Sequence, residues 1–151
     1  MLPEISHPIL DNIEDFCKLY LDEKVPHIPA EAKAQIVRHL PIAVIIIIVA
    51  QLASILSYFQ IVTLFTGLGY LYYVSPGIIG FVGILLLAVA ALLEGVAVPL
   101  LFRHKIKGWR YVFYAVLVAG INDIINLNIV NLIFAGLVIL YILFQVRDEY
   151  K

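Results

Sequence analysis

Long apolar runs separated by short polar segments dominate this sequence, and they predict transmembrane helices. Residues 40–74 contain no ionised side chain, and residues 77–102 contain one, Glu94. A helix of roughly 20 apolar residues is long enough to cross the hydrocarbon core of a bilayer. We therefore predict an all-α fold, a polytopic transmembrane helical bundle with four spans at about 41–60, 77–102, 110–126 and 129–146.

The segment 61–74 follows the first predicted span and differs from it in composition. It is rich in aromatic residues and contains Gly67 and Gly69. Because aromatic rings favour the membrane interface, we expect an interfacial or re-entrant helix here. The alternative is that this segment completes an additional span.

Basic residues mark one side of the predicted membrane. They precede the first span, cluster at 103–110 and recur after the fourth span, while the other two loops contain none. The positive-inside rule therefore places both termini and the 103–110 loop in the cytoplasm. Four spans satisfy this pattern, whereas five would put the N-terminus on the opposite side. Within the loop, we expect Trp109 to act as an interfacial anchor, and we expect the tail QVRDEYK at 145–151 to return to water.

Composition excludes an ordinary soluble fold. The chain is 63% hydrophobic and 14% charged, whereas soluble domains are about half apolar and about a quarter charged. Too few polar residues are present to cover a water-soluble surface, so lipid must solvate the excess. The net charge of −1 gives no electrostatic reason to expect a nucleic-acid partner.

Residues 1–38 are expected to form a cytoplasmic amphipathic helical segment before the four-helix transmembrane domain at 39–151. Residues 8–22 place apolar side chains at helical spacing along one face. We assign Asp11, Glu14, Asp15 and Lys18 to the opposite face, which is therefore mainly acidic. An acidic face disfavours adsorption to anionic lipid, so this helix should pack on protein. Cys17, the only cysteine, lies within it, either as a packing residue or as a reactive or lipidated thiol.

Glu94 is the most informative candidate site residue. It precedes Arg103 by nine positions, about 13 Å along a helix, and so lies near the middle of the bilayer. A carboxylate there costs at least ~2.5 kcal/mol, so it should be protonated, paired or directed into an interior cavity. Two roles fit this position, namely a hydrogen bond that holds helices together and the handling of protons or ions.

Gln51 lies at a comparable depth in the first span and is the expected partner of Glu94. Ser54 and Tyr58 follow it at helical spacing, which makes a polar stripe expected to face inward. This stripe could form a functional site together with Glu94, or it could only hold the helices together by hydrogen bonds. Both interpretations predict contact between the first two spans.

A second polar group lies at the presumed outer end of spans three and four. It consists of Asn122, Asp123, Asn126, Asn128 and Asn131. These side chains could line a mouth or bind a cation through oxygen ligands. They could equally form an ordinary polar turn, and their spacing matches no calcium-binding loop.

Sequence signatures of cofactor or enzyme chemistry are not found. The four histidines are scattered outside the predicted spans at His7, His27, His39 and His104. The chain shows no phosphate-binding glycine loop and no nucleophile elbow. We therefore predict no metal, no cofactor and no enzymatic activity.

Part of the sequence resembles small four-span bacterial integral membrane proteins. The resemblance is carried by KIKGWRYVFYA at 105–115, the asparagine-rich turn, and LYILFQVRDEY at 140–150. It covers about the last third of the chain. It implies a multi-pass protein of the bacterial inner (plasma) membrane and carries over no activity and no functional residue.

Together these features lead us to expect a non-enzymatic membrane scaffold or accessory subunit. Its partners would be the lipid bilayer and either a second copy of the chain or another membrane protein, with the amphipathic N-terminal helix offered to that partner. The alternative is an oligomeric small transporter or channel in which Glu94 is a protonatable intramembrane site.

Overall fold

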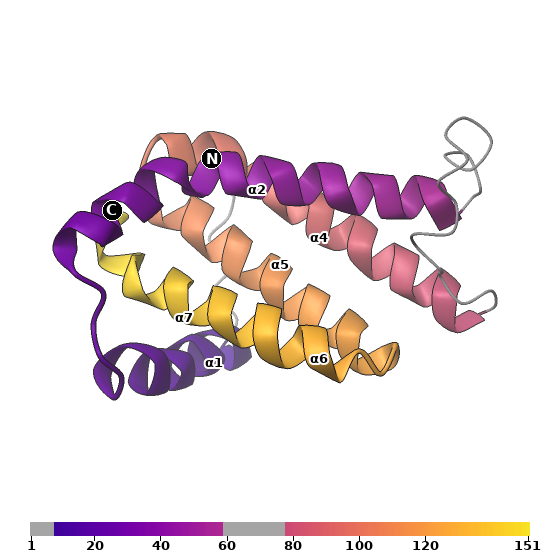
Figure 1. The fold of residues 1–151 in the computed structure, drawn as a ribbon, viewed down its shortest axis with the longest axis horizontal. Helices are drawn as coiled ribbons and strands as arrows, with labels where there is room; N and C mark the ends of the chain where they lie inside the picture. Colours follow the sequence, from indigo (N-terminus) through magenta and orange to yellow (C-terminus); the bar gives the residue numbers. More distant parts are fainter. Residues whose placement is uncertain (1–7, 59–77) are drawn as a thin grey trace.

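The computed structural model describes residues 8–58 and 78–151, and every regular element in these ranges is helical. The predicted all-α fold is therefore confirmed for the described part of the chain, and the predicted 61–74 helix lies outside it. In chain order the elements are α1 (Pro8–Lys18), the π-helical turn η1 (Leu19–Glu23), α2 (Ala30–Tyr58), α4 (Ile78–Phe102), α5 (Ile106–Ile125), α6 (Ile129–Asn131), the π-helical turn η2 (Leu132–Gly136), α7 (Leu137–Gln145) and the 3₁₀ turn η3 (Arg147–Glu149). Figure 1 labels the α-helices among them.

Two helices, α2 and α4, are long and apolar enough to cross a membrane. Their outward faces are lined by large aliphatic side chains, for example Ile46, which is 64% exposed, and Leu92, which is 72% exposed. Such faces suit hydrocarbon as solvent. By contrast, α5 carries charged residues near both ends, and η2 interrupts the helical segment at 129–145.

The first long helix runs without a break from Ala30 to Tyr58. It passes through Pro41, which lacks a backbone N–H and so cannot make the usual helical hydrogen bond. One continuous helix therefore joins the basic segment before residue 40 to the apolar segment after it.

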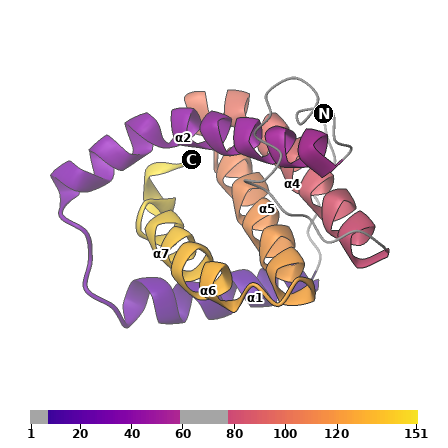
Figure 2. The same ribbon diagram turned by 45° about the vertical axis from the view of Figure 1, so that its right-hand side comes forward.

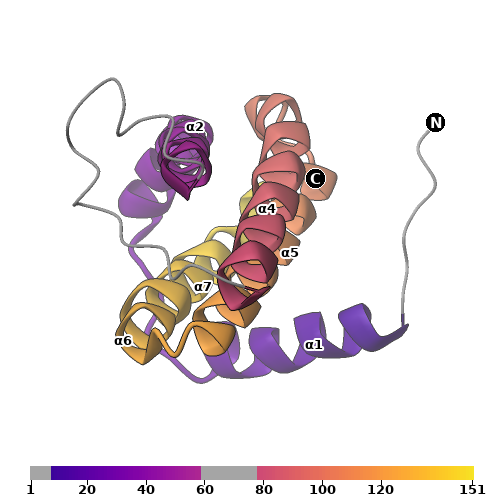
Figure 3. The same ribbon diagram turned by 90° about the vertical axis from the view of Figure 1, so that its right-hand side faces the viewer.

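The helices are arranged around an α4–α5 hairpin. On one side α2 packs along α4, and the α6–η2–α7 segment packs on α5. In three views α1 lies on the opposite side of the α5–α7 pair from α2 (Figure 1, Figure 2, Figure 3). The N-terminal helix is thus a component of the folded unit.

A cluster of fully buried side chains lies at the end of the bundle near the basic loop. Trp109, Phe113 and Phe144 form its centre, with ring centroids 5.1 to 5.6 Å apart. Trp109 is fully buried, and its indole N–H donates a 2.7 Å hydrogen bond to the Leu143 carbonyl. The expectation that Trp109 is an interfacial anchor is wrong, because the ring and its polar atom are both satisfied inside the protein.

The C-terminal tail also departs from its prediction. Gln145, Val146 and Tyr150 are buried, so this segment does not simply return to water. Lys151 pairs with the α4–α5 turn, donating its N–H to the His104 carbonyl at 3.0 Å and accepting from the Ile106 N–H at 2.9 Å. These bonds satisfy backbone groups that the turn would otherwise leave unpaired.

Gly108 permits the close approach of α5 to the end of α4. A Cβ on Gly108 would lie 2.8 Å from both the Leu100 Cβ and the Leu101 backbone nitrogen. We expect Gly108→Ala to lower the free energy of unfolding by roughly 1–2 kcal/mol, because the overpacked contact involves backbone that must shift.

Denaturation in detergent would measure this loss, and Gly95 supplies the matched control. A Cβ there would meet no atom within 4 Å in the described part of the chain. Gly95→Ala should therefore be neutral or stabilising by up to ~1 kcal/mol, since alanine is the better helix former. Equal losses for the two variants would contradict the assigned packing.

Candidate functional site

The candidate site begins with a pair of buried polar side chains on the two long helices. Gln51 on α2 donates a hydrogen bond from its Nε2 to Glu94 Oε1 on α4, at 3.3 Å. Both residues are buried. The predicted pairing is present, and so is the predicted contact between the two helices.

One polar side-chain atom of each residue in this pair is left without a hydrogen bond. Glu94 Oε2 and Gln51 Oε1 are buried and have no hydrogen-bond partner among the residues that the structure describes. A buried acceptor without a donor costs roughly 1–3 kcal/mol. The site therefore favours a proton on Glu94 or a donor brought by another molecule.

The other members of the predicted polar stripe do not extend the pair. The Ser54 hydroxyl donates to the Ala50 carbonyl of its own helix at 2.9 Å. Tyr58 ends α2, and its side chain lies outside the described residues. Within the described residues, the polar side chain that α2 brings to Glu94 is thus Gln51.

A cleft of about 380 Å³ lies between α2 and the α5–α7 pair, and Glu94 is the side chain that α4 contributes to it. The polar side chains that line the cleft are His39, Gln51, Glu94, Asp123 and Asn131. The remaining lining is apolar and includes Val44, Ile47, Val116, Ile139 and Ile142. Figure 3 shows α2 standing apart from α7 on this side of the bundle.

The asparagine-rich group uses its polar atoms within a turn. Asn131 donates to Asp123 Oδ2 at 2.7 Å, the side chain of Asn126 donates to Asn122, and the Asn128 backbone N–H donates to the Asp123 carbonyl at 2.8 Å. Within the described ranges 8–58 and 78–151, no group of three acidic, histidine or cysteine side chains could hold a metal ion. These contacts support a structural polar turn at this end of the bundle.

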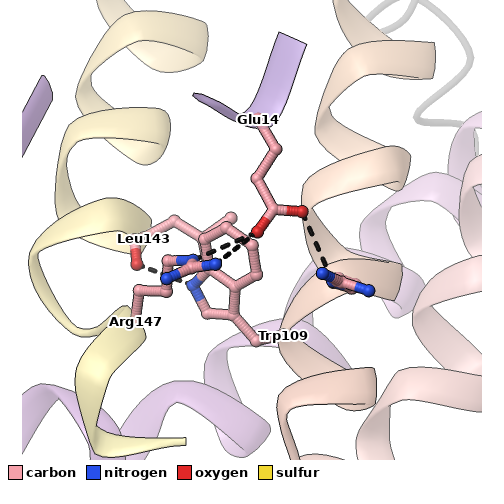
Figure 4. A network of polar contacts seen from close by, with 5 residues as sticks. Glu14, Trp109, Leu143 and Arg147 are labelled. Carbon is pink, nitrogen blue, oxygen red and sulfur yellow. Dashed lines mark hydrogen bonds and ion pairs between the residues drawn. The ribbon is translucent and has the colours of Figure 1, made fainter. Parts of the chain in front are cut away.

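A second buried polar cluster joins the N-terminal helix to the bundle (Figure 4). Glu14 Oε1 accepts from Arg147 Nη2 at 2.6 Å and from Arg147 Nε at 3.2 Å, while Glu14 Oε2 lies 3.3 Å from Arg110 Nε. The Arg147 guanidinium also lies over the Trp109 ring, 5.5 Å from its centroid. Two N–H groups of one guanidinium thus share a single carboxylate oxygen, and charge-assisted hydrogen bonds of this kind are roughly twice as strong as neutral ones.

The assignment of Glu14 to the solvent-facing acidic face is therefore wrong, since this residue is 3% exposed. The sequence did contain the signal. Glu14 falls within the helical stripe formed by Leu10, Ile13, Cys17 and Leu21, because positions three and four apart share a face. A carboxylate inside an apolar stripe predicts a buried cationic partner.

Further bonds fix the segment that follows α1. Gln145 donates to the Leu21 carbonyl at 3.2 Å and accepts from the Ile28 N–H at 3.0 Å, and the Tyr141 hydroxyl donates to the Pro26 carbonyl at 2.7 Å. The prediction that the amphipathic helix packs on protein is confirmed, and the protein is its own chain. Sequence reasoning missed Gln145, which is buried and bonds on both sides to the segment that follows α1.

Tyr150 makes stability depend on alkaline pH. Its hydroxyl has no hydrogen-bond partner within the described ranges, and burial raises the pKa of Tyr150 to about 12. In the unfolded chain a tyrosine ionises near pH 10. Its folded pKa is the higher one, so the stability it contributes is complete below about pH 10 and is lost as pH rises towards 12.

Denaturation curves collected from pH 8 to 12 would test this. Tyr150→Phe keeps the ring and removes the ionisable group, so its stability should fall less steeply over that interval. Parallel curves for the two proteins would show that Tyr150 does not carry the effect.

No protein-family model matches this sequence, and neither a curated protein nor a solved structure matches it.

Proposed function

We propose that this chain is a four-span protein of the bacterial inner membrane, with both termini in the cytoplasm, that acts as a non-enzymatic scaffold or accessory subunit. The apolar outward faces of α2 and α4 and the basic residues at one end of the bundle support the membrane topology. The resemblance of the last third to small bacterial membrane proteins supports the compartment.

One observation carries the scaffold role. The helix α1 is held on the bundle by Glu14, yet its other side exposes Ile9 (71%) and Phe16 (62%), and Tyr20 beside Phe16 is also exposed. Apolar side chains held outward in a fixed orientation are typical of an interaction surface. The partner would be a second copy of this chain or another membrane protein.

Topology can be tested with single cysteines in a Cys17→Ser background. A membrane-impermeant maleimide applied to spheroplasts should label Asn128→Cys, in the turn between α5 and α6, and should leave Lys107→Cys unlabelled until the membrane is permeabilised. Labelling of position 107 from the outside would overturn the proposed orientation.

The scaffold surface can be tested by its effect on assembly. The mass of the complex that the chain forms in mild detergent should be lower for Phe16→Asp than for the wild type. It should be unchanged for Asn12→Asp, a substitution at an exposed polar position on the same helix. A complex of unchanged mass in both variants would argue against α1 as the docking element.

A second candidate function is an oligomeric small transporter or channel with Glu94 as its protonatable site. The unpartnered Oε2 of Glu94 in the cleft favours it. Glutamine keeps the size and most hydrogen bonds of glutamate but cannot release a proton. If purified protein in liposomes shows a pH-dependent flux that Glu94→Gln abolishes, the scaffold role fails. If flux is absent and Glu94→Ala mainly lowers stability, the transport role fails.

A further inference from the structure

We infer that the cleft between α2 and the α5–α7 pair binds a hydrophobic molecule that carries an ammonium group or another cationic N–H donor. This inference rests on the membrane arrangement proposed above and on the Glu94 site of the second candidate function, but it does not require transport. It assigns the chemical class of the ligand.

The polar side chains in the middle of the lining, Glu94 and Gln51, define the head group. Glu94 Oε2 and Gln51 Oε1 are both acceptors, both buried, and both without a donor in the part of the chain that the structure describes. A molecule with N–H donors would satisfy both atoms. A positive charge would further offset the cost of an ionised Glu94 in a low-dielectric site, whereas an anion would meet only acceptors.

The lining defines the rest of the molecule. Apart from its polar positions, the cleft is walled by aliphatic side chains from three helices. Its volume of about 380 Å³ lies within the range of about 300–1,000 Å³ typical of small-molecule sites. An apolar body of the size of a short alkyl chain would replace hydrocarbon contacts with protein contacts there.

The depth of Glu94 separates this ligand class from a soluble cation. The residue precedes Arg103 by nine positions, about 13 Å along its helix, and it lines the cleft. A hydrated metal ion would need several oxygen ligands beside Glu94. The other carboxylate in the lining, Asp123, already accepts a hydrogen bond from Asn131. An amine with an alkyl chain partitions into the bilayer and needs only the two vacant acceptors.

The test uses the full chain in nanodiscs of phosphatidylcholine, with octylamine as the probe. We expect saturable octylamine binding above that of empty nanodiscs. Octyltrimethylammonium has the same charge and no N–H donor, and it should bind about tenfold more weakly, the factor that corresponds to one lost charge-assisted hydrogen bond. Octanoate should not bind.

Three variants locate the site. Glu94→Gln should weaken octylamine binding by at least about tenfold, and Ala119→Phe, which fills the cleft and leaves Glu94 intact, should abolish it. Glu31→Gln removes an exposed carboxylate from α2 and should bind as the wild type does. Binding that is equal in wild type and in both cleft variants, or equal to that of empty nanodiscs, would overturn the inference.

Two further arms identify the source and separate the outcomes. Phosphatidylethanolamine also carries a primary ammonium, so competition from this lipid in the nanodisc would support the site and make a lipid head group its natural ligand. Octylamine binding without flux in liposomes would leave this inference standing and remove the transport role. Flux that depends on Glu94 without octylamine binding would do the reverse.

Discussion

Trp109→Ala is expected to lower the free energy of unfolding by about 3 kcal/mol. The side chain is fully buried, contacts two aromatic rings and donates a hydrogen bond to Leu143. Alanine would leave a large cavity and an unpaired carbonyl oxygen within this buried cluster. We place the loss at the low end of the usual range for tryptophan because packing among helices in lipid gains less from removal of apolar surface from water.

Denaturation in detergent would measure the loss, and two variants divide it. Trp109→Phe keeps an aromatic ring but not the N–H donor, so it should cost roughly 1 kcal/mol for the hydrogen bond, plus some lost packing. Phe102→Ala removes a ring of comparable kind that is largely exposed at the end of α4, and it should change stability by less than about 0.5 kcal/mol. If Trp109→Ala were as mild as Phe102→Ala, the ring would not be the centre of the core.

The sequence predicted the long helices well because hydrophobic run length is a local property. The segment predicted at 77–102 is observed as α4, Ile78–Phe102. The helix predicted at 110–126 begins earlier, at Ile106. The difference arises because the basic loop is a tight turn, in which His104 adopts φ 51° and Gly108 packs against Leu100.

The Glu94–Gln51 pair was predictable for a different reason. Two polar side chains at similar depth in neighbouring apolar helices have few other partners, so depth alone favours their contact. The cleft beside them was not predictable, because its shape depends on the distance between α2 and the α5–α7 pair. That distance is set by tertiary packing rather than by any local pattern.

The contacts of the N-terminal helix escaped prediction because they join residues far apart in the sequence. Glu14 meets Arg147 and Arg110 only after the chain has folded back on itself. Trp109 was assigned to the membrane interface from its place beside a basic loop. The indole N–H of Trp109 instead donates to the carbonyl of Leu143, which lies in α7, beyond the next turn of the chain.

Loss of Glu14 is expected to release α1 from the bundle. Breaking a buried ion pair typically costs about 3–5 kcal/mol. We expect about 2 kcal/mol for Glu14→Ala, because the side chains of Arg147 and Arg110 remain 24% and 32% exposed and can be partly solvated once unpaired. A change of this size multiplies the equilibrium for local opening of α1 by roughly 30.

The native cysteine reports this opening without an added label. Cys17 is partly buried beside the core on α1, and burial raises the pKa of its thiol, which keeps the reactive thiolate scarce in the docked state. Undocking would expose the thiol and return its pKa towards the ordinary value, so Glu14→Ala should raise the rate of maleimide modification at pH 7, by at most roughly 30-fold because the partly exposed thiol also reacts in the docked state. Asp15→Ala removes the neighbouring, exposed carboxylate and should leave the rate near that of the wild type. If the two variants reacted at the same rate, the contacts of Glu14 with the two arginines would not be what holds α1 in place.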